Sequence, residues 1–176
     1  MIKLEGINRI ITFLVNGQRF GIRLTEVDKI IRAVEITPIP NGPNYLCGII
    51  DMHEEVVPVV NMHVKIGLPD RPTRIEDRFI IANTNNRVIA LRVDEVTEII
   101  ENLENQYLNN IEAITSDLDI HGIIRSDDGL ILIYNLETFL TSEDFDFLDE
   151  YSRNRTDEDN VSLKTLENNG MANQIS

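Results

Sequence analysis

The sequence predicts a mostly β fold built from small closed or nearly closed barrels, with short helices between some strands. Short runs rich in Val and Ile recur between turn-forming residues, and each run has the length of one strand. An Asn-Gly pair at residues 16–17 marks a tight hairpin. The chain also contains an internal repeat. Because many short strands leave exposed edges unless a sheet closes on itself, we expect barrels.

Two blocks of the sequence recur in the same order. Residues 22–31 align with residues 91–100 and are identical at five of ten positions. Residues 48–62 align without gaps with residues 122–136, at a slightly larger offset. Two matches in order indicate a duplicated β unit of roughly 70 residues. We expect subdomains over about 8–70 and 75–142, within a domain over 1–148, and a groove between the two modules.

In the first copy, strands are expected over 9–15 and 18–24, because Asn-Gly suits the two positive-φ positions of a type I′ turn. Residues 25–34 carry apolar residues at helical spacing but could equally begin a strand, so both readings stay open. Residues 36–43, with three prolines, predict an edge strand that runs into a turn. A central hairpin pairs 46–50 with 56–60, and 61–68 suits a brief helix that ends near Gly67.

In the second copy, a proline-containing linker over 69–73 precedes a hairpin of 79–82 with 88–93. Residues 96–103 repeat the helix-or-strand ambiguity, and 122–124 with 130–134 form the last strand pair. After Leu140, Ser142 is the expected N-cap of a short amphipathic turn. Residues 149–176 are rich in acidic and other polar residues and predict a disordered tail.

Charge and composition limit the possible partners. The formal net charge of −14 argues against nucleic acid and against direct contact with an anionic membrane, because both need Lys and Arg. No run approaches the roughly 20 apolar residues of a membrane span, and the first residues lack the apolar core of a signal peptide. Cys47 is the one cysteine, so no intramolecular disulfide can form. We expect a cytoplasmic protein and a buried, inert thiol.

Motifs of enzymes and cofactor sites are absent from the sequence. There is no phosphate-binding glycine loop, nucleophile elbow or Cys-x-x-Cys pair. The histidines His53, His63 and His121 lack the spacing that brings three or four metal ligands together. Glu54-Glu55 and Asp127-Asp128 occupy equivalent hairpin connectors, where solvated turn residues are the common case. We therefore expect no enzyme activity, no catalytic residues, no cofactor and no metal.

Ordered segments over about residues 8–150 carry a family resemblance. They include Phe20-Gly21-Ile22, Ile36-Thr37-Pro38-Ile39-Pro40, Gly48-Ile49-Ile50, Val56 to Met62 and Leu132 to Glu137. Together they resemble the CheW family of chemotaxis coupling proteins. The resemblance implies two SH3-like five-stranded barrels with a hydrophobic groove between them.

The resemblance also implies a function and two contact surfaces. Such a protein is a non-enzymatic adaptor that joins the cytoplasmic tips of methyl-accepting chemotaxis receptors to the regulatory domain of the histidine kinase CheA. It would reach membrane receptor arrays through these protein partners. By position, the kinase-facing surface would include Val27, Lys29, Ile30, Pro40, Tyr45 and Gly48. The receptor-facing groove would include His53, Val56, Val96 and Leu136.

The chain departs from the family pattern at a few positions. Family members usually carry Asn-Leu-Arg-Gly at residues 51–54 and Asp-Leu-Arg at residues 61–63, whereas this chain has His53, Glu54 and His63. Exchanging Arg for His removes a permanent charge and a five-donor fork, and it leaves a group that titrates near neutrality. Lys29 replaces a residue that is often acidic. These changes indicate a diverged member of the family.

Two other functions remain open on the sequence. The first is a CheW-like adaptor in a kinase array for surface motility or differentiation. The second belongs to a different class, a small-ligand-binding or hydrolytic β-barrel that uses Glu54, Glu55 and the histidines. Binding of the kinase regulatory domain separates the adaptor hypotheses from this last one.

Overall fold

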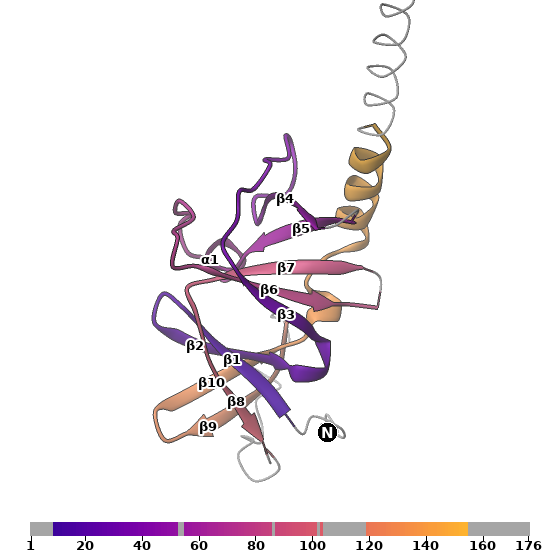
Figure 1. The fold of residues 1–176 in the computed structure, drawn as a ribbon. Helices are drawn as coiled ribbons and strands as arrows, with labels where there is room; N and C mark the ends of the chain where they lie inside the picture. The colour runs from indigo at the N-terminus through magenta and orange to yellow at the C-terminus, as the bar shows by residue number, and fades with distance from the viewer. Residues whose placement is uncertain (1–8, 53–54, 86, 102, 104–118, 155–176) are drawn as a thin grey trace, which may run out of the picture. The chain divides into compact units, whose positions relative to one another are not determined.

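The computed structural model describes residues 9–52, 55–85, 87–101, 103 and 119–154 (Figure 1). The chain divides into two compact units, residues 1–139 and 140–176. The described part of the first unit consists mostly of β-strands, as the sequence predicts. The strands are β1 (Arg9–Val15), β2 (Gln18–Arg23), β3 (Val27–Arg32), β4 (Leu46–Met52), β5 (Glu55–Asn61), β6 (Arg78–Asn83), β7 (Val88–Val93), β8 (Glu95–Glu101), β9 (Ile120–Ser126) and β10 (Gly129–Tyr134).

The strands form two five-stranded sheets, which confirms the predicted fold class. Sheet A has the order β8-β1-β2-β10-β9, and sheet B has the order β3-β6-β7-β5-β4. If β1 to β5 are matched with β6 to β10, the two orders are the same, so the structure has the symmetry expected of a duplicated unit. The sheets are consistent with two SH3-like barrels.

Each sheet takes strands from both copies of the repeat. The hairpin β1–β2 of the first copy joins sheet A through parallel pairing of β2 with β10, and β6–β7 joins sheet B through parallel pairing of β7 with β5. The predicted subdomains over 8–70 and 75–142 therefore do not coincide with the two sheets. The physical reason is that parallel neighbours require a long crossover, so the partners of each hairpin lie far away in the chain.

Local signals explain the tight turns, and pairing between strands resolves the ambiguous segments. Asn16 and Gly17 have φ values of 51° and 77°, as a type I′ hairpin requires. The residues that could have been helix or strand are strands, β3 and β8, and a single 3-10 turn, η1 (Leu24–Glu26), precedes β3. Strand β3 pairs with β6 and β8 pairs with β1, so tertiary hydrogen bonding overrides the helical spacing.

The proline-rich connection after β3 is tied to the opposite edge of sheet B. The Thr37 and Ile49 backbones exchange two hydrogen bonds of 2.9 Å, one in each direction. These bonds form an isolated bridge rather than the edge strand expected over 36–43. Because Ile49 lies on β4, the bridge brings the chain that follows one edge strand against the other edge of the sheet.

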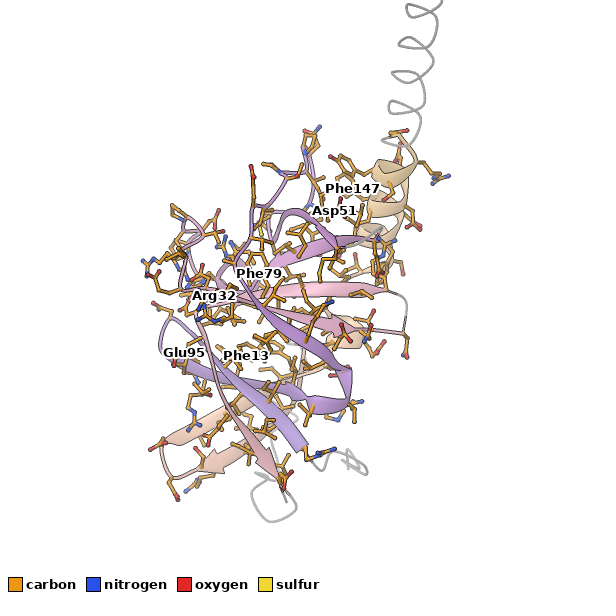
Figure 2. All side chains as sticks on the ribbon, in the orientation of Figure 1. Phe13, Arg32, Asp51, Phe79, Glu95 and Phe147 are labelled. Atoms are coloured by element: carbon orange, nitrogen blue, oxygen red, sulfur yellow. The ribbon has the colours of Figure 1, made fainter. Side chains whose placement is uncertain are left out.

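Each sheet covers a core of aliphatic residues. Figure 2 shows Phe13 on β1 and Phe79 on β6, and both side chains are fully buried. Around Phe79, the sheet B core consists of Ile50, Val57, Val59, Ile81 and Ala90. A sheet A core consists of Ile10, Leu103, Ile124, Ile131 and Ile133.

The second unit is helical over residues 142–154. Its N-terminus is capped by Thr141 rather than by Ser142, because Thr141 and Asp144 form a reciprocal capping box. Residues 149–154, predicted as the start of a disordered tail, belong to this helix, and 155–176 lie outside the described residues. Among the residues that the structure describes, no helix has the length and apolar character needed to cross a membrane.

Candidate functional site

The first predicted contact surface follows β3, an end strand of sheet B. Lys29 and Ile30 are exposed, and Val27 is half-buried. Side chains alternate along the strand, so Ile31 packs against the sheet B core while Ile30 keeps 40% of its surface exposed. The structure therefore presents an aliphatic side chain next to a lysine on this edge.

Three further residues of this predicted surface lie after β3. Pro40 is exposed, and Tyr45 is half-buried with the Lys65 ammonium group 4.5 Å from its ring centroid. Gly48 is buried at φ +148°, where a Cβ atom would lie 2.2 Å from the carbonyl oxygen of Thr37. Gly48 therefore allows the close approach of the 36–43 connection to β4, and it presents no surface to a partner.

Of the described residues predicted to face the receptor, Val56 and Val96 lie on different sheets. Val56 on β5 is 43% exposed, whereas Val96 on β8 is half-buried. Leu136, in the 3-10 turn η3 (Leu136–Thr138), is buried and cannot contact a partner directly. His53 lies outside the described residues.

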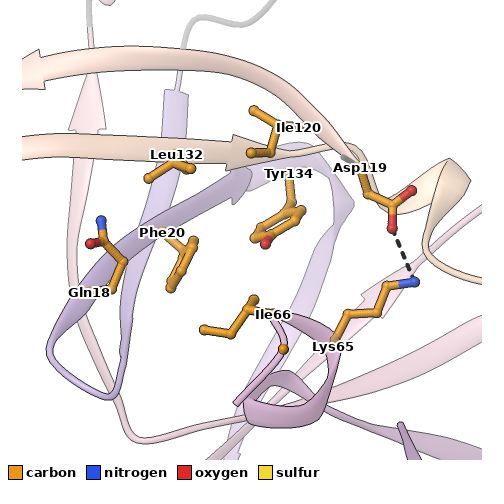
Figure 3. A pocket seen from close by; sticks show the side chains of 9 residues that line it. Gln18, Phe20, Lys65, Ile66, Asp119, Ile120, Leu132 and Tyr134 are labelled. Atoms are coloured by element: carbon orange, nitrogen blue, oxygen red, sulfur yellow. Dashed lines mark ion pairs between the residues drawn. The ribbon is translucent and has the colours of Figure 1, made fainter. Parts of the chain in front are cut away.

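A pocket lies between sheet A and the short helical segment that follows β5 of sheet B. Its volume is about 610 Å³, and an ion pair between Lys65 of α1 (Met62–Lys65) and Asp119 borders it (Figure 3). Most of the remaining lining is apolar, and none of the described residues predicted to face the receptor contributes to it. The lining residues are Gln18, Phe20, Lys65, Ile66, Gly67, Asp119, Ile120, Leu132 and Tyr134.

Two exposed aliphatic residues of sheet A were not among the contact residues predicted from the sequence. Ile99 on β8 is 52% exposed and is the repeat equivalent of Ile30. Leu130 on β10 is 45% exposed and is the equivalent of Val56. The repeat alignment could have identified both residues, because they are the second-copy counterparts of predicted contact positions.

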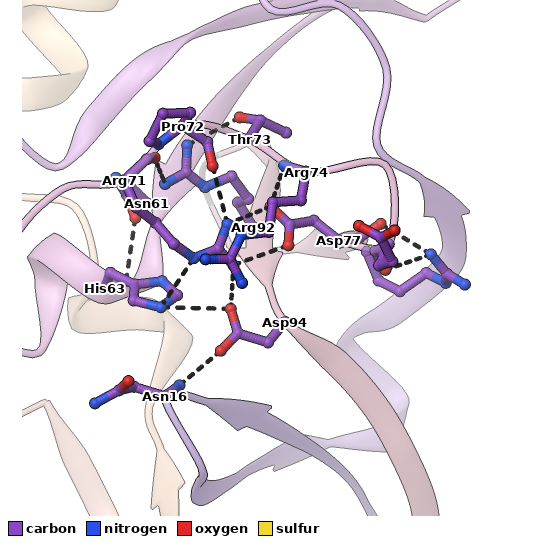
Figure 4. Close-up of polar contacts among 12 residues, drawn as sticks. Asn16, Asn61, His63, Arg71, Pro72, Thr73, Arg74, Asp77, Arg92 and Asp94 are labelled. Carbon is purple, nitrogen blue, oxygen red and sulfur yellow. Dashed lines mark hydrogen bonds and ion pairs between the residues drawn. The ribbon is translucent and has the colours of Figure 1, made fainter.

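The predicted linker over 69–73 belongs to a dense polar cluster (Figure 4). Arg71 donates two hydrogen bonds to the Asp77 carboxylate, at 2.9 and 2.8 Å, and also binds Asp94. Asp94 in turn accepts a 2.7 Å hydrogen bond from the backbone N–H of Asn16, in the β1–β2 turn. The cluster therefore holds the loop after α1, the end of β7 and a hairpin of sheet A together.

His63 belongs to this cluster and is buried. Arg71 Nε donates to His63 Nε2 at 3.3 Å, so that nitrogen carries a lone pair and the ring is neutral. His63 Nδ1 is buried and has no hydrogen-bond partner among the residues that the structure describes.

The burial of two histidines makes the stability of the protein depend on pH. Burial lowers the pKa of His63, and burial together with the charge of Arg23 lowers the pKa of His121. Below pH 6.5 the unfolded chain binds protons that the folded chain does not, so stability is lost as the pH falls from 6.5 toward the folded pKa values. We expect the free energy of unfolding, measured with urea, to be lower at pH 5 than at pH 7.

Substitution with glutamine tests this dependence, because a glutamine oxygen at residue 63 can still accept from Arg71. His63→Gln and His121→Gln are each expected to reduce the difference between pH 5 and pH 7, and the double variant to reduce it most. A pH profile that is identical in the double variant and the parent protein would contradict the assignment.

Other candidate chemical groups are accounted for by local contacts. Burial raises the pKa of Cys47 to about 11, and its thiol donates to the Val59 carbonyl at 3.4 Å. A thiol with a raised pKa is a poor nucleophile near neutral pH. Within the described ranges, no group of three or more His, Cys, Asp or Glu side chains is arranged to hold a metal ion.

Comparison with known proteins identifies the kind of fold. The model of a family described as CheW-like domain matches residues 9–144. The chemotaxis protein CheW of Bacillus subtilis is 28% identical over 137 residues, which cover 77% of this chain and 88% of that protein. The CheW of Rhizobium meliloti is 25% identical over 143 residues, 80% of this chain and 92% of that protein.

A solved structure agrees with these sequence relatives. The crystal structure of the scaffolding protein TtCheW from Thermoanaerobacter tengcongensis superimposes with a TM-score of 0.70 at 27% identity. The match covers 78% of this chain and 94% of that chain. The similarity therefore extends over both sheets.

Proposed function

This chain belongs to the CheW-like domain family and is a coupling protein of the scaffold type, and we propose that it joins the regulatory domain of CheA to the cytoplasmic tips of methyl-accepting chemotaxis receptors. The observation that carries the proposal is the family match over residues 9–144, which includes every strand of both sheets. A scaffold of this kind acts without catalysis, and it would work in the cytoplasm and reach the membrane arrays through its partners.

We place the kinase-facing surface on the β3 edge and the connection that follows it. It consists of Val27, Lys29, Ile30, Pro40 and Tyr45, with Gly48 beneath it as a structural support. A transient interface of about 1,000 to 1,600 Å² in total would be sufficient for specific binding. Ile30 is the proposed anchor, because the few residues that dominate an interface are usually apolar or aromatic side chains that become buried.

For the receptor we assign the pocket between sheet A and α1. Phe20, Ile66, Leu132 and Tyr134 give it an apolar lining, which suits the apolar stripe of a helix. Val56 and Val96, together with His53, remain the proposed additional contacts around this groove. Leu136 would act only as a buried support.

The test is a titration of this protein against the CheA regulatory domain and, separately, against a cytoplasmic receptor fragment from the same organism. It is run at fixed salt and at pH 6 and pH 8. Micromolar binding of both partners supports the coupling function. If the protein binds the kinase domain but no chemoreceptor fragment, it is an adaptor of another kinase array. If it binds neither partner, the proposal is contradicted.

A further inference from the structure

The internal repeat brings equivalent residues of the two copies together between the sheets. Tyr45 and Asp119, each directly before the first strand of a repeated hairpin, are related by the same offset as Gly48 and Gly122. Their backbone carbonyls accept equivalent hydrogen bonds. The Tyr45 carbonyl accepts from the Asn61 N–H at 2.7 Å, and the Asp119 carbonyl accepts from the Asn135 N–H at 2.8 Å. Local geometry as well as sequence therefore supports the equivalence.

Lys65 and its own repeat equivalent, Phe139, meet at the same place. The Lys65 ammonium group lies 3.0 Å from the Asp119 carboxylate, donates to the Phe139 carbonyl at 2.7 Å and lies 4.5 Å from the centroid of the Tyr45 ring. The Lys65 side chain thus contacts Tyr45 and Asp119, which are repeat equivalents of each other, and Phe139, which is the repeat equivalent of Lys65. The Lys65 side chain is 14% exposed, so these contacts are largely shielded from water.

These contacts connect the two sheets across one end of the pocket. Lys65 belongs to α1, which follows β5 of sheet B, whereas Asp119 precedes β9 and Phe139 follows the turn after β10 of sheet A. Lys65 and Asp119 also line the pocket itself (Figure 3). Loss of the ammonium group would remove the bond to Asp119 and the bond to Phe139 together.

We propose that Lys65 is a positioning residue that holds α1, which follows β5 of sheet B, at a fixed spacing from sheet A across the pocket, and so fixes the groove for the receptor helix. This inference rests on the proposed function. Lys65 acts through Asp119 and Phe139 rather than by binding the receptor, because its ammonium group already has partners within the chain. A groove held in its binding shape avoids the ordering cost that a loose groove incurs on association.

The first test measures the affinity of a cytoplasmic receptor fragment at a temperature where all variants are folded. We expect Lys65→Met and Asp119→Asn each to weaken binding about tenfold, and the double variant to be no weaker than Lys65→Met, since Lys65→Met already removes the ion pair that Asp119→Asn removes. Lys65→Arg keeps the ion pair and should stay within about threefold of the parent protein. Arg125→Met, which removes a positive charge from an exposed side chain outside the pocket and outside both proposed surfaces, is the control.

The second test measures sheet spacing without any partner. Spin labels at Glu55 in sheet B and Asp128 beside sheet A, in a Cys47→Ser background, report the distance distribution between the sheets. Lys65→Met should broaden or shift that distribution, and Lys65→Arg should not. An unchanged distribution in Lys65→Met overturns the inference. If the parent protein binds no receptor fragment, the proposed function fails, and the spin labels still decide the role of Lys65.

Discussion

Ile30→Asp is expected to weaken binding of the CheA regulatory domain by about 100-fold, because it removes an apolar anchor and buries an unpaired carboxylate in the interface. Ile30 is 40% exposed on an end strand of sheet B, and its neighbour Ile31 supplies the contact with the core. The fold should therefore tolerate the change. We expect the free energy of unfolding to stay within about 1 kcal/mol of the parent value. Isothermal titration with the kinase domain measures the loss of affinity.

The repeat provides a matched control for this variant. Ile99 occupies the equivalent position on sheet A, with 52% of its surface exposed. Ile99→Asp makes the same chemical change outside the proposed kinase surface, and it should leave the affinity for the isolated regulatory domain nearly unchanged. If Ile99→Asp abolishes binding and Ile30→Asp does not, the kinase surface lies on sheet A and the assignment to β3 is wrong.

The positions of the strands could be predicted from local sequence, whereas their partners could not. Runs of β-branched residues and the Asn16-Gly17 turn determine where the first strands begin and end, and these are properties of a few neighbouring residues. The pairing of β2 with β10 joins the two ends of the repeated region, for example Phe20 with Leu132. Nothing in a single repeat copy indicates that its first hairpin completes the sheet of the other copy.

The candidate site was predictable to a similar extent. The exposed face of β3 follows from strand alternation, so Ile30 could be placed at the surface once β3 was accepted as a strand. The burial of His63 could not be foreseen, because its partner Arg71 lies in a segment with the composition of a linker. The role of Lys65 depends on Asp119, which lies in the other copy of the repeat, and no spacing rule connects these two positions.

Gly48→Ala is expected to destabilise the protein by about 3 to 5 kcal/mol, through a forced backbone shift and an unfavourable φ. The new Cβ atom would lie 2.2 Å from the Thr37 carbonyl oxygen and 2.5 Å from Cγ2 of Ile36. The carbonyl cannot move away easily, because Thr37 is fixed to Ile49 by two hydrogen bonds. Urea unfolding measures the change, as a lower midpoint with a similar slope.

Gly17→Ala separates the cost of φ from the cost of the close contact. Gly17 has φ +77°, and no atom would lie within 4 Å of a Cβ added there, so its replacement should cost only about 1 kcal/mol. A Gly48→Ala variant no less stable than Gly17→Ala would show that the 36–43 connection yields to the new methyl group. Because Pro40 of the proposed kinase surface lies on that connection, kinase affinity should fall with stability in Gly48→Ala and remain unchanged in Gly17→Ala. Measured below the unfolding temperatures of both variants, a loss of kinase affinity in Gly48→Ala alone would support the role of the 36–43 connection in shaping the kinase surface.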